Sequence, residues 1–192
     1  MMLSYTELCG LVDDGVIDAN PALINGASID VRLGQTLLLE QRRTDNAVID
    51  LSRREAMATQ RFEMDATGYK IPPGQFLLAE TIETFNLPDD IAAFFLLKSS
   101  MARAGLEHSQ AGFADPGWHG SVLTMELKNL TQHYYLHLRP GMRIGQIVFF
   151  RVQPVPAERS YAALGAYNGL SSVAATRVMA MPARAEKTPV AA

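Results

Sequence analysis

The sequence has few of the residues that build disulfides and metal centres. Its 192 residues include a single cysteine, Cys9, and four histidines. One cysteine excludes an intramolecular disulfide, which is typical of proteins in a reducing compartment, and the chain has no HExxH motif for zinc. We therefore expect a cytoplasmic protein without a zinc site.

Long apolar runs and an excess of positive charge are also missing. No stretch approaches the 18 apolar residues of a membrane helix, and the first ten residues lack the basic and apolar regions of a signal peptide. The net charge of −3 gives no basic surface for a nucleic acid polymer or an anionic membrane. We expect neither as a partner, and a small anionic ligand would need a local cluster of cations.

The apolar residues that are present suffice for one core. Hydrophobic residues make up 48% of the chain and charged residues 19%, and the length fits one domain. We predict a single domain over residues 1–180. Residues 181–192 show no periodicity and are expected to form a mobile tail.

Short apolar or alternating runs, separated by Pro-Gly turns, predict a mainly β fold. Little room is left for crossover helices, which favours an antiparallel sandwich, jelly roll or barrel. Two short helices are expected, one after the capping-box sequence Ser4-x-x-Glu7 and one near 99–105. The expected strands are 28–39, 75–80, 91–97, 121–127, 133–138 and 144–151.

Residues 98–103, with the sequence KSSMAR, form the first candidate site. They place Lys98, Ser99, Ser100 and Arg103 at a predicted helix start, where cations, hydroxyls and free backbone N–H groups can hold a phosphate. An ordinary helix cap with a solvated arginine would have the same sequence, so the segment alone leaves both interpretations open.

Residues 111–120, with the sequence AGFADPGWHG, form the second candidate site. Asp115 and Trp118 flank a Pro-Gly turn, where the carboxylate can accept a hydrogen bond from a sugar hydroxyl and the indole can pack on the apolar face of the sugar. Aspartate before Pro-Gly is also a common turn former, which is the simpler interpretation of this segment alone.

The third candidate is a carboxylate within an apolar strand. Alternation over 121–127 places Met125 and Leu127 on one face and Thr124 and Glu126 on the other. If the second face looks outward, Glu126 is solvated. If it lines a pocket, burial raises the pKa of the carboxyl and suits it to proton transfer.

Together and in this order, these stretches resemble the dCTP deaminase branch of the dUTPase-like superfamily. The resemblance spans nearly the whole chain, and it implies a distorted β jelly roll of the dUTPase-like type, assembled as a homotrimer with active sites at subunit interfaces. The matching segments are INGASIDVRLG at 24–34, KSSMARAGL at 98–106, AGFADPGWHG at 111–120, the Glu126 strand ending in Lys128-Asn129, RPGMRIGQIVFF at 139–150 and YNGLSSVAATR at 167–177.

The resemblance implies catalytic roles for four residues. Glu126 matches the glutamate that takes a proton from the water attacking C4 of cytosine and passes protons to the ring and the departing ammonia. Ser99 and the backbone carbonyl of Ala111 match the groups that place this water. Arg103 matches the residue that orients the glutamate.

The resemblance also implies how the nucleotide is held. Ser100 and Gln146 match triphosphate contacts, with Lys98 where the family usually has arginine. Asp115 matches the acceptor of the 3′-hydroxyl, and Trp118 the ring that packs on deoxyribose. Mg²⁺ is expected to accompany the triphosphate, and no metal is expected to hold the attacking water.

Besides Lys98, the chain departs from the family pattern in three ways. The C-terminal segment offers Tyr161 and Tyr167 where a lysine and glutamines are expected to close over the triphosphate. The segment between Arg103 and Asp115 is one residue short. The segment between Gly120 and Glu126 is one residue long, which a β-bulge can absorb.

The reaction implied is deamination of dCTP to dUTP and ammonia. A first alternative is hydrolysis of dUTP, alone or after deamination in a bifunctional enzyme, releasing dUMP and pyrophosphate. Here an aspartate at the position of Asp115 would activate the attacking water. A second alternative is a nucleotide-binding or regulatory protein without catalysis.

Overall fold

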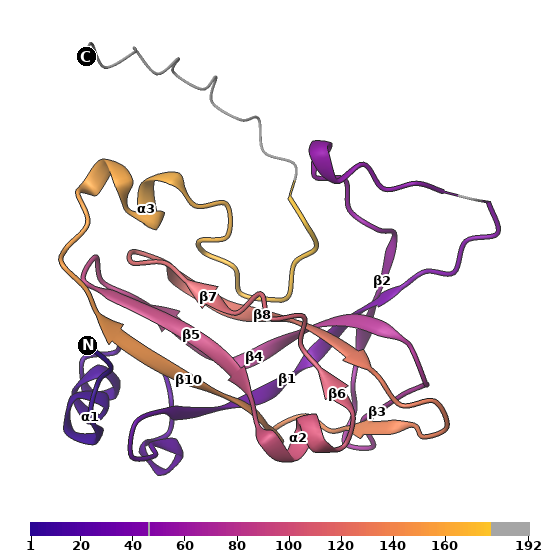
Figure 1. Ribbon diagram of the computed structural model, residues 1–192, viewed down its shortest axis with the longest axis horizontal. Helices are drawn as coiled ribbons and strands as arrows, with labels where there is room; N and C mark the ends of the chain where they lie inside the picture. The colour runs from indigo at the N-terminus through magenta and orange to yellow at the C-terminus, as the bar shows by residue number, and fades with distance from the viewer. Residues whose placement is uncertain (46, 178–192) are drawn as a thin grey trace, which may run out of the picture.

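Antiparallel β-structure dominates the molecule in the computed structural model, which describes residues 1–45 and 47–177 (Figure 1). The strands are β1 (Ile29–Glu40), β2 (Thr59–Glu63), β3 (Tyr69–Ile71), β4 (Phe76–Asn86), β5 (Ile91–Leu97), β6 (Leu106–Glu107), β7 (Phe113–Ala114), β8 (His119–Asn129), β9 (Leu136–Leu138) and β10 (Arg143–Arg151). The α-helices are α1 (Tyr5–Asp13), α2 (Ser99–Arg103) and α3 (Tyr161–Leu164), and short 3-10 turns occur at Pro21–Leu23, Leu51–Arg53 and Ala157–Arg159.

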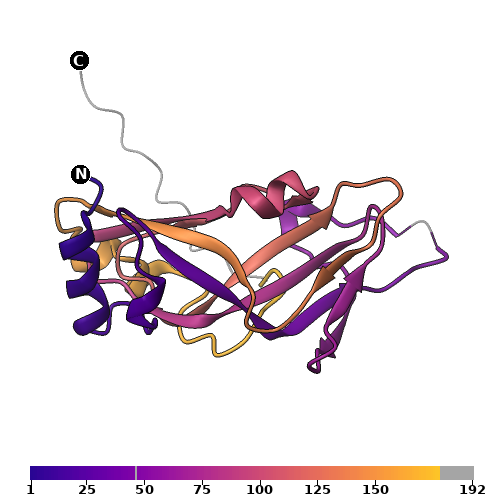
Figure 2. The same ribbon diagram turned by 90° about the horizontal axis from the view of Figure 1, so that it is seen from below.

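Most strands belong to one curled sheet. Its order is β6-β8-β4-β1-β10-β5-β7, with β2 also paired to β1, while β3 and β9 form a separate pair. The long β1 pairs with β10 through its first residues and with β4 and β2 through its later ones. This change of partners accompanies the curl of the sheet into a half-barrel (Figure 2). The mainly β class predicted from the sequence is confirmed.

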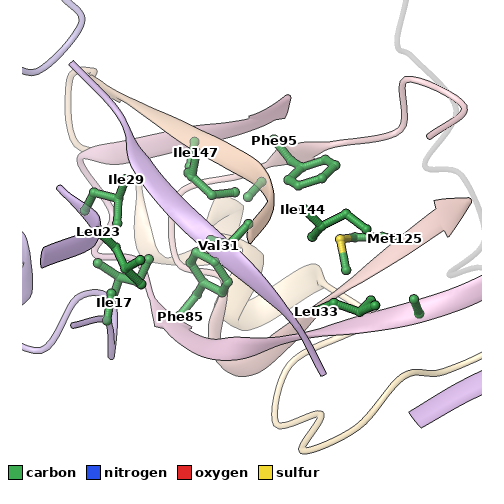
Figure 3. Close-up of a cluster of buried hydrophobic side chains, with 14 of the residues drawn as sticks. Ile17, Leu23, Ile29, Val31, Leu33, Phe85, Phe95, Met125, Ile144 and Ile147 are labelled. Carbon is green, nitrogen blue, oxygen red and sulfur yellow. The ribbon is translucent and has the colours of Figure 1, made fainter. Parts of the chain in front are cut away.

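The concave side of the sheet holds the main core. Alternate residues of β1, namely Ile29, Val31 and Leu33, are fully buried and meet Phe85 of β4 and Phe95 of β5 in one cluster (Figure 3). The two-residue spacing of these β1 side chains is the period of a strand with one face buried. Burial of each such side chain contributes about 1.5 to 3 kcal/mol to folding.

The predicted helices are present, with one local correction. Ser4 caps α1, and its backbone N–H donates to the Glu7 carboxylate over 2.9 Å, as the capping box predicts. Helix α2 covers Ser99–Arg103, but its N-cap is Lys98, and no side chain caps this helix. The sequence suggested Ser99 or Ser100 as the N-cap, and this is wrong, because both serines lie inside the helix. The predicted tail 181–192 lies outside the described residues.

All six predicted strands are found, as β1, β4, β5, β8, β9 and β10, although β9 is shorter than expected. Sequence patterns missed β2, β3, β6 and β7. These strands are two to five residues long, too short to show a period of two.

A bulge in β8 separates the Pro-Gly turn from Glu126. Phe85 pairs with Ser121, but the next residue, Asn86, pairs with His119, so Gly120 is an extra residue in β8. Gly120 has φ +61°, a conformation that glycine adopts without a Cβ penalty. Thr124 and Glu126 lie beyond this bulge in a regular stretch of the ladder, so they share one face of β8.

Two glycines at this end of β8 should respond differently to substitution. A Cβ at Gly117, where φ is +85°, would meet Asp89 Oδ1 at 2.8 Å and would also overlap Ser160 Oγ. A Cβ at Gly120 would have Gly169 Cα as its nearest neighbour at 3.6 Å, an ordinary contact. Gly117→Ala should therefore cost about 2 to 4 kcal/mol of stability and Gly120→Ala only about 1 kcal/mol. Urea unfolding at fixed protein concentration measures both, and equal losses would contradict this packing.

Candidate functional site

A pocket of about 510 Å³ lies on the face of β4 and β8 that points away from the main core. The turn 111–118, helix α3 and the stretch 167–176 contribute to its wall. In Figure 1 these segments lie beside β7 and β8. Its walls are Ile49, Leu51, Glu55, Ala56 and Met57 from the β1–β2 connection, Phe76 and Leu78 of β4, residues 111, 113–115 and 118, residues 122–124 and 126 of β8, and residues 161, 167, 170 and 174–176.

Glu126 projects into this pocket from the middle of β8. Its two sequence neighbours, Met125 and Leu127, are buried in the main core, so alternation turns Glu126 to the pocket. Leu78 of β4 is its direct cross-strand partner and belongs to a small apolar cluster. Of the two interpretations that the sequence left open, the pocket is the one observed.

Burial in this apolar wall raises the pKa of the Glu126 carboxyl above its usual value near 4.5. The cause is desolvation, since the ionised form loses water while its neighbours on the strand pair are apolar. Within the described ranges no other residue donates a hydrogen bond to this carboxylate. A pocket carboxyl with a raised pKa is a candidate for taking up and returning a proton.

Asp115 and Trp118 lie at the pocket wall, held by the predicted Pro-Gly turn. Asp115 is exposed, whereas the Trp118 ring is buried and stacks on Phe85 at 5.2 Å between ring centroids. The Trp118 indole N–H donates to the Tyr167 carbonyl over 3.0 Å, which fixes the ring against the C-terminal segment. The structure thus brings together Asp115, Trp118 and Glu126.

Tyr161 and Tyr167 complete this group. The Tyr161 backbone N–H donates to the Pro116 carbonyl over 2.9 Å, which ties α3 to the turn. Burial raises the pKa of the Tyr161 hydroxyl. Backbone hydrogen bonds at Tyr167 and Ala166 partly oppose this shift, and the charges of Tyr167 and Asp115 add to it. Ala111 also lines the pocket, so six of the predicted site residues share it.

The remaining predicted residues do not line this pocket within one protomer. Ser99, Ser100 and Arg103 of α2 are exposed at the surface. Helix α2 is followed by β6, whose Leu106 pairs with Asn129 at the far end of β8 from Trp118. Within one chain, the side chains proposed for the water and for phosphate thus lie outside the pocket that contains Glu126.

Lys98 and Gln146 belong to a polar cluster around Asp30 of β1. The Lys98 ammonium contacts Asp30 Oδ1 at 2.7 Å, and Asn25 Nδ2 donates to the same oxygen over 2.9 Å. Gln146 accepts a hydrogen bond from Ser28 over 3.2 Å. Asp30 is only 1% exposed. Lys98 is thus engaged with a buried carboxylate, and a phosphate group would have to share it.

The described part of the chain offers no preformed metal centre, since no group of three or more His, Cys, Asp or Glu side chains there is placed to hold an ion. None of the helices in this described part is long and apolar enough to cross a membrane.

Comparison with known proteins identifies the family. The model of a family described as dCTP deaminase-like matches residues 2–152, well over half of the chain. The chain belongs to the dCTP deaminase family. The resemblance read from the motifs is confirmed.

The curated relatives of this dCTP deaminase family member carry a common name. Proteins named "dCTP deaminase, dUMP-forming" are similar to the chain in Beutenbergia cavernae, at 41% identity over 169 residues, and in Streptomyces avermitilis, at 40% over 167 residues. The first match covers 84% of both chains, and the second covers 84% of this chain and 85% of the relative.

A solved structure shares the fold. The 2′-deoxycytidine 5′-triphosphate deaminase from Agrobacterium tumefaciens superimposes with a TM-score of 0.62 at 19% sequence identity. The match covers 79% of this chain and 48% of that one, so the chain spans about half of that protein's length. This likeness concerns the fold alone.

Sequence reasoning missed two walls of the pocket. One is the β1–β2 connection with Ile49, Leu51 and Met57, and the other is the stretch 174–176. The first has no motif, and the second lies in the family-like segment 167–177 without a predicted role there. Both line the pocket through long-range packing. The apolar character of the first stretch was the only available signal.

The raised pKa of Glu126 predicts a pH-dependent change in stability. A carboxyl whose pKa is raised in the folded state favours folding while it is protonated, and this contribution is lost as the pH rises through the folded-state pKa. Glu126→Gln should therefore be more stable than the natural chain at pH 7, and the difference should shrink toward pH 4. Thermal unfolding at both pH values measures this, with Glu40→Gln at the exposed end of β1 as the control. A less stable Glu126→Gln protein at pH 7 would contradict the pocket environment.

Proposed function

We propose that the protein is an enzyme that deaminates dCTP, with Glu126 as general base. The observation that carries the proposal is the position of Glu126, which projects into the pocket with a raised pKa and shares that pocket with Asp115 and Trp118. The family membership and the names of the relatives support the choice of substrate. The single free cysteine suits a reducing cytoplasm.

The chemistry requires one carboxyl that both accepts and donates protons. Ionised Glu126 takes a proton from water as the water oxygen bonds to C4 of cytosine. The protonated carboxyl gives this proton to N3. It then accepts the proton of the new C4 hydroxyl and passes it to the amino group, and the C4–N bond breaks as the C4 carbonyl forms, giving dUTP and ammonia. Because burial raises the pKa of Glu126, its carboxyl holds the accepted proton more readily than an exposed glutamate would. A positioned general acid–base contributes about 10²- to 10⁴-fold in rate.

The pocket also suits the sugar and the base. Asp115 is exposed at the wall, where its carboxylate can accept the 3′-hydroxyl, and Trp118 is held rigidly beside it. The apolar residues of β4 and the β1–β2 connection can pack on the faces of an uncharged pyrimidine. We propose that Tyr161 and Tyr167 close this end of the pocket.

Mg²⁺ accompanies the triphosphate in this proposal. Mg²⁺ commonly keeps several waters and binds through substrate phosphates, so dedicated protein ligands are not required. The chain's own residues perform the proton transfer at C4.

A second reaction is favoured by the relatives, whose names describe them as dUMP-forming. We propose that the dUTP is hydrolysed in turn. A second water attacks the α-phosphorus, the bond from this phosphorus to the bridging oxygen breaks, and dUMP and pyrophosphate leave. Asp115, exposed in the same pocket, is the carboxylate placed to activate that water.

A second copy of the chain completes the site in this proposal. Ser99, Ser100 and Arg103 are exposed and do not line the pocket of their own protomer. If they place the water, the triphosphate and Glu126, they must come from a neighbouring subunit. The homotrimer implied by the family resemblance would supply them.

Product analysis of Glu126→Gln tests the first reaction. With dCTP and Mg²⁺, the natural chain should release ammonia and dUMP with pyrophosphate, while Glu126→Gln should release ammonia at least about 100-fold more slowly. The same variant should still hydrolyse dUTP supplied directly, because Asp115 is retained.

Two results would contradict the proposal. Ammonia release that survives Glu126→Gln would remove the role given to this residue. Nucleotide binding without any turnover by the natural chain would instead support a regulatory protein.

Subunit complementation tests the shared site. Glu126→Ala and Arg103→Ala proteins should each be inactive as homo-oligomers. When unfolded together and refolded at equal amounts, random assembly in a ring should restore about one quarter of the natural activity, because some interfaces pair an intact Glu126 with an intact Arg103. The absence of any recovery, with mixed oligomers shown by mass spectrometry, would place both residues in one subunit's site.

A further inference from the structure

Glu80 of β4 is a half-buried carboxylate that joins two parts of the chain. One oxygen, Oε1, accepts a hydrogen bond from the Thr36 backbone N–H of β1 over 3.2 Å. The other, Oε2, accepts one from the Ser172 hydroxyl over 2.6 Å and one from the Val173 backbone N–H over 2.8 Å. Hydrogen bonds to a charged acceptor are about twice as strong as those between neutral groups.

The segment that Glu80 holds is a wall of the pocket. Val173 is buried against Leu38 and Leu78, and the following residues, 174–176, line the pocket. Two further contacts support the segment. Arg61 donates to the Ser172 hydroxyl over 3.2 Å, and the Ala174 backbone N–H donates to Thr124 over 3.3 Å.

The strand register connects this anchor to the candidate base. Glu80 pairs directly with Thr124, and Leu78 pairs directly with Glu126, two rungs apart on the β4–β8 ladder. Residues two apart on a strand share a face, so all four side chains lie on one face of the strand pair. The wall is therefore attached two rungs from Glu126, on the strand pair that contains it.

We propose that Glu80 is a positioning residue that fixes the wall 172–176 over the nucleotide pocket. Its carboxylate suits this role because all three of its partners are donors. A glutamine at this position has the same shape but must turn its amide N–H₂ toward at least one donor. The wall would then detach more often, and the pocket would hold its ligand less firmly. The part of the proposal that concerns the nucleotide rests on the proposed function.

Hydrogen exchange of the whole chain tests the anchor without any substrate. In Glu80→Gln, the amides of Val173 and Ala174 should exchange at least about tenfold faster, the change expected for loss of one hydrogen bond to a charged group. The amide of Leu127 in β8 should be unaffected. Glu40→Gln, which changes an exposed carboxylate at the end of β1, is the matched control. Unchanged exchange at Val173 would overturn the proposal.

Kinetics with dCTP test whether the wall positions the nucleotide. Glu80→Gln should raise KM severalfold and change kcat by less than about twofold, because Glu80 does not touch the reacting atoms. A purely structural role would leave KM unchanged for the folded fraction, and that result would overturn the positioning role even if exchange were faster.

A second variant, Ser172→Ala, tests the same anchor in case Glu80→Gln misfolds. Ser172→Ala removes one of the three bonds to Glu80 and leaves the carboxylate in place, so it should give a smaller change in the same direction for both exchange and KM. No change in either would overturn the proposal. If the natural chain does not deaminate dCTP, the proposed function fails, while the exchange data still decide whether Glu80 anchors the wall.

Discussion

The pairing of β4 with β8 is the constraint on which the candidate site depends. It is an antiparallel ladder with two register shifts, and it is regular over the stretch from Glu80–Thr124 to Phe76–Lys128 that contains Glu126. A slip of one residue would turn Glu126 into the main core and Met125 into the pocket. The same ladder places Leu78 opposite Glu126, and this apolar neighbour explains why the carboxyl is desolvated.

Two polar regions of the molecule have different proposed roles. The pocket holds Glu126 among apolar walls, where the loss of hydration raises the pKa of the carboxyl. The cluster around Asp30 holds Lys98 in an ion pair at 2.7 Å and places cations near α2. In the proposed assembly, the second region of one subunit faces the first region of its neighbour. A site divided in this way exists only when the subunits associate.

Local patterns predicted the fold well where elements are long. The alternation of β1 and β8, the capping box of α1 and the Pro-Gly turn before Trp118 all rest on interactions between residues near in sequence. Periodicity also identified Glu126 as one member of a distinct face of β8. It could not decide whether that face lines a pocket, because the walls 49–57 and 174–176 come from distant parts of the chain.

The side-chain interactions that the sequence did not predict join residues far apart in the chain. The ion pair of Lys98 with Asp30 joins residues 68 positions apart, and the bonds from Glu80 to Ser172 and Val173 span more than 90. Glu80 stands at the end of the run QFLLAE with no local sign of its role. The motifs of the family indicated which residues belong to one site, but within a single protomer Ser99 and Arg103 lie outside the pocket that contains Glu126.

The central claim is that a desolvated Glu126 must be ionised to start deamination of dCTP. The most direct measurement is the pH dependence of kcat/KM for ammonia release, set beside a direct titration of the Glu126 carboxyl by NMR. We expect an acid limb with an apparent pKa above the usual glutamic acid value near 4.5, coinciding with the titration of Glu126. A rate that stays constant as the pH falls through that titration would contradict the account.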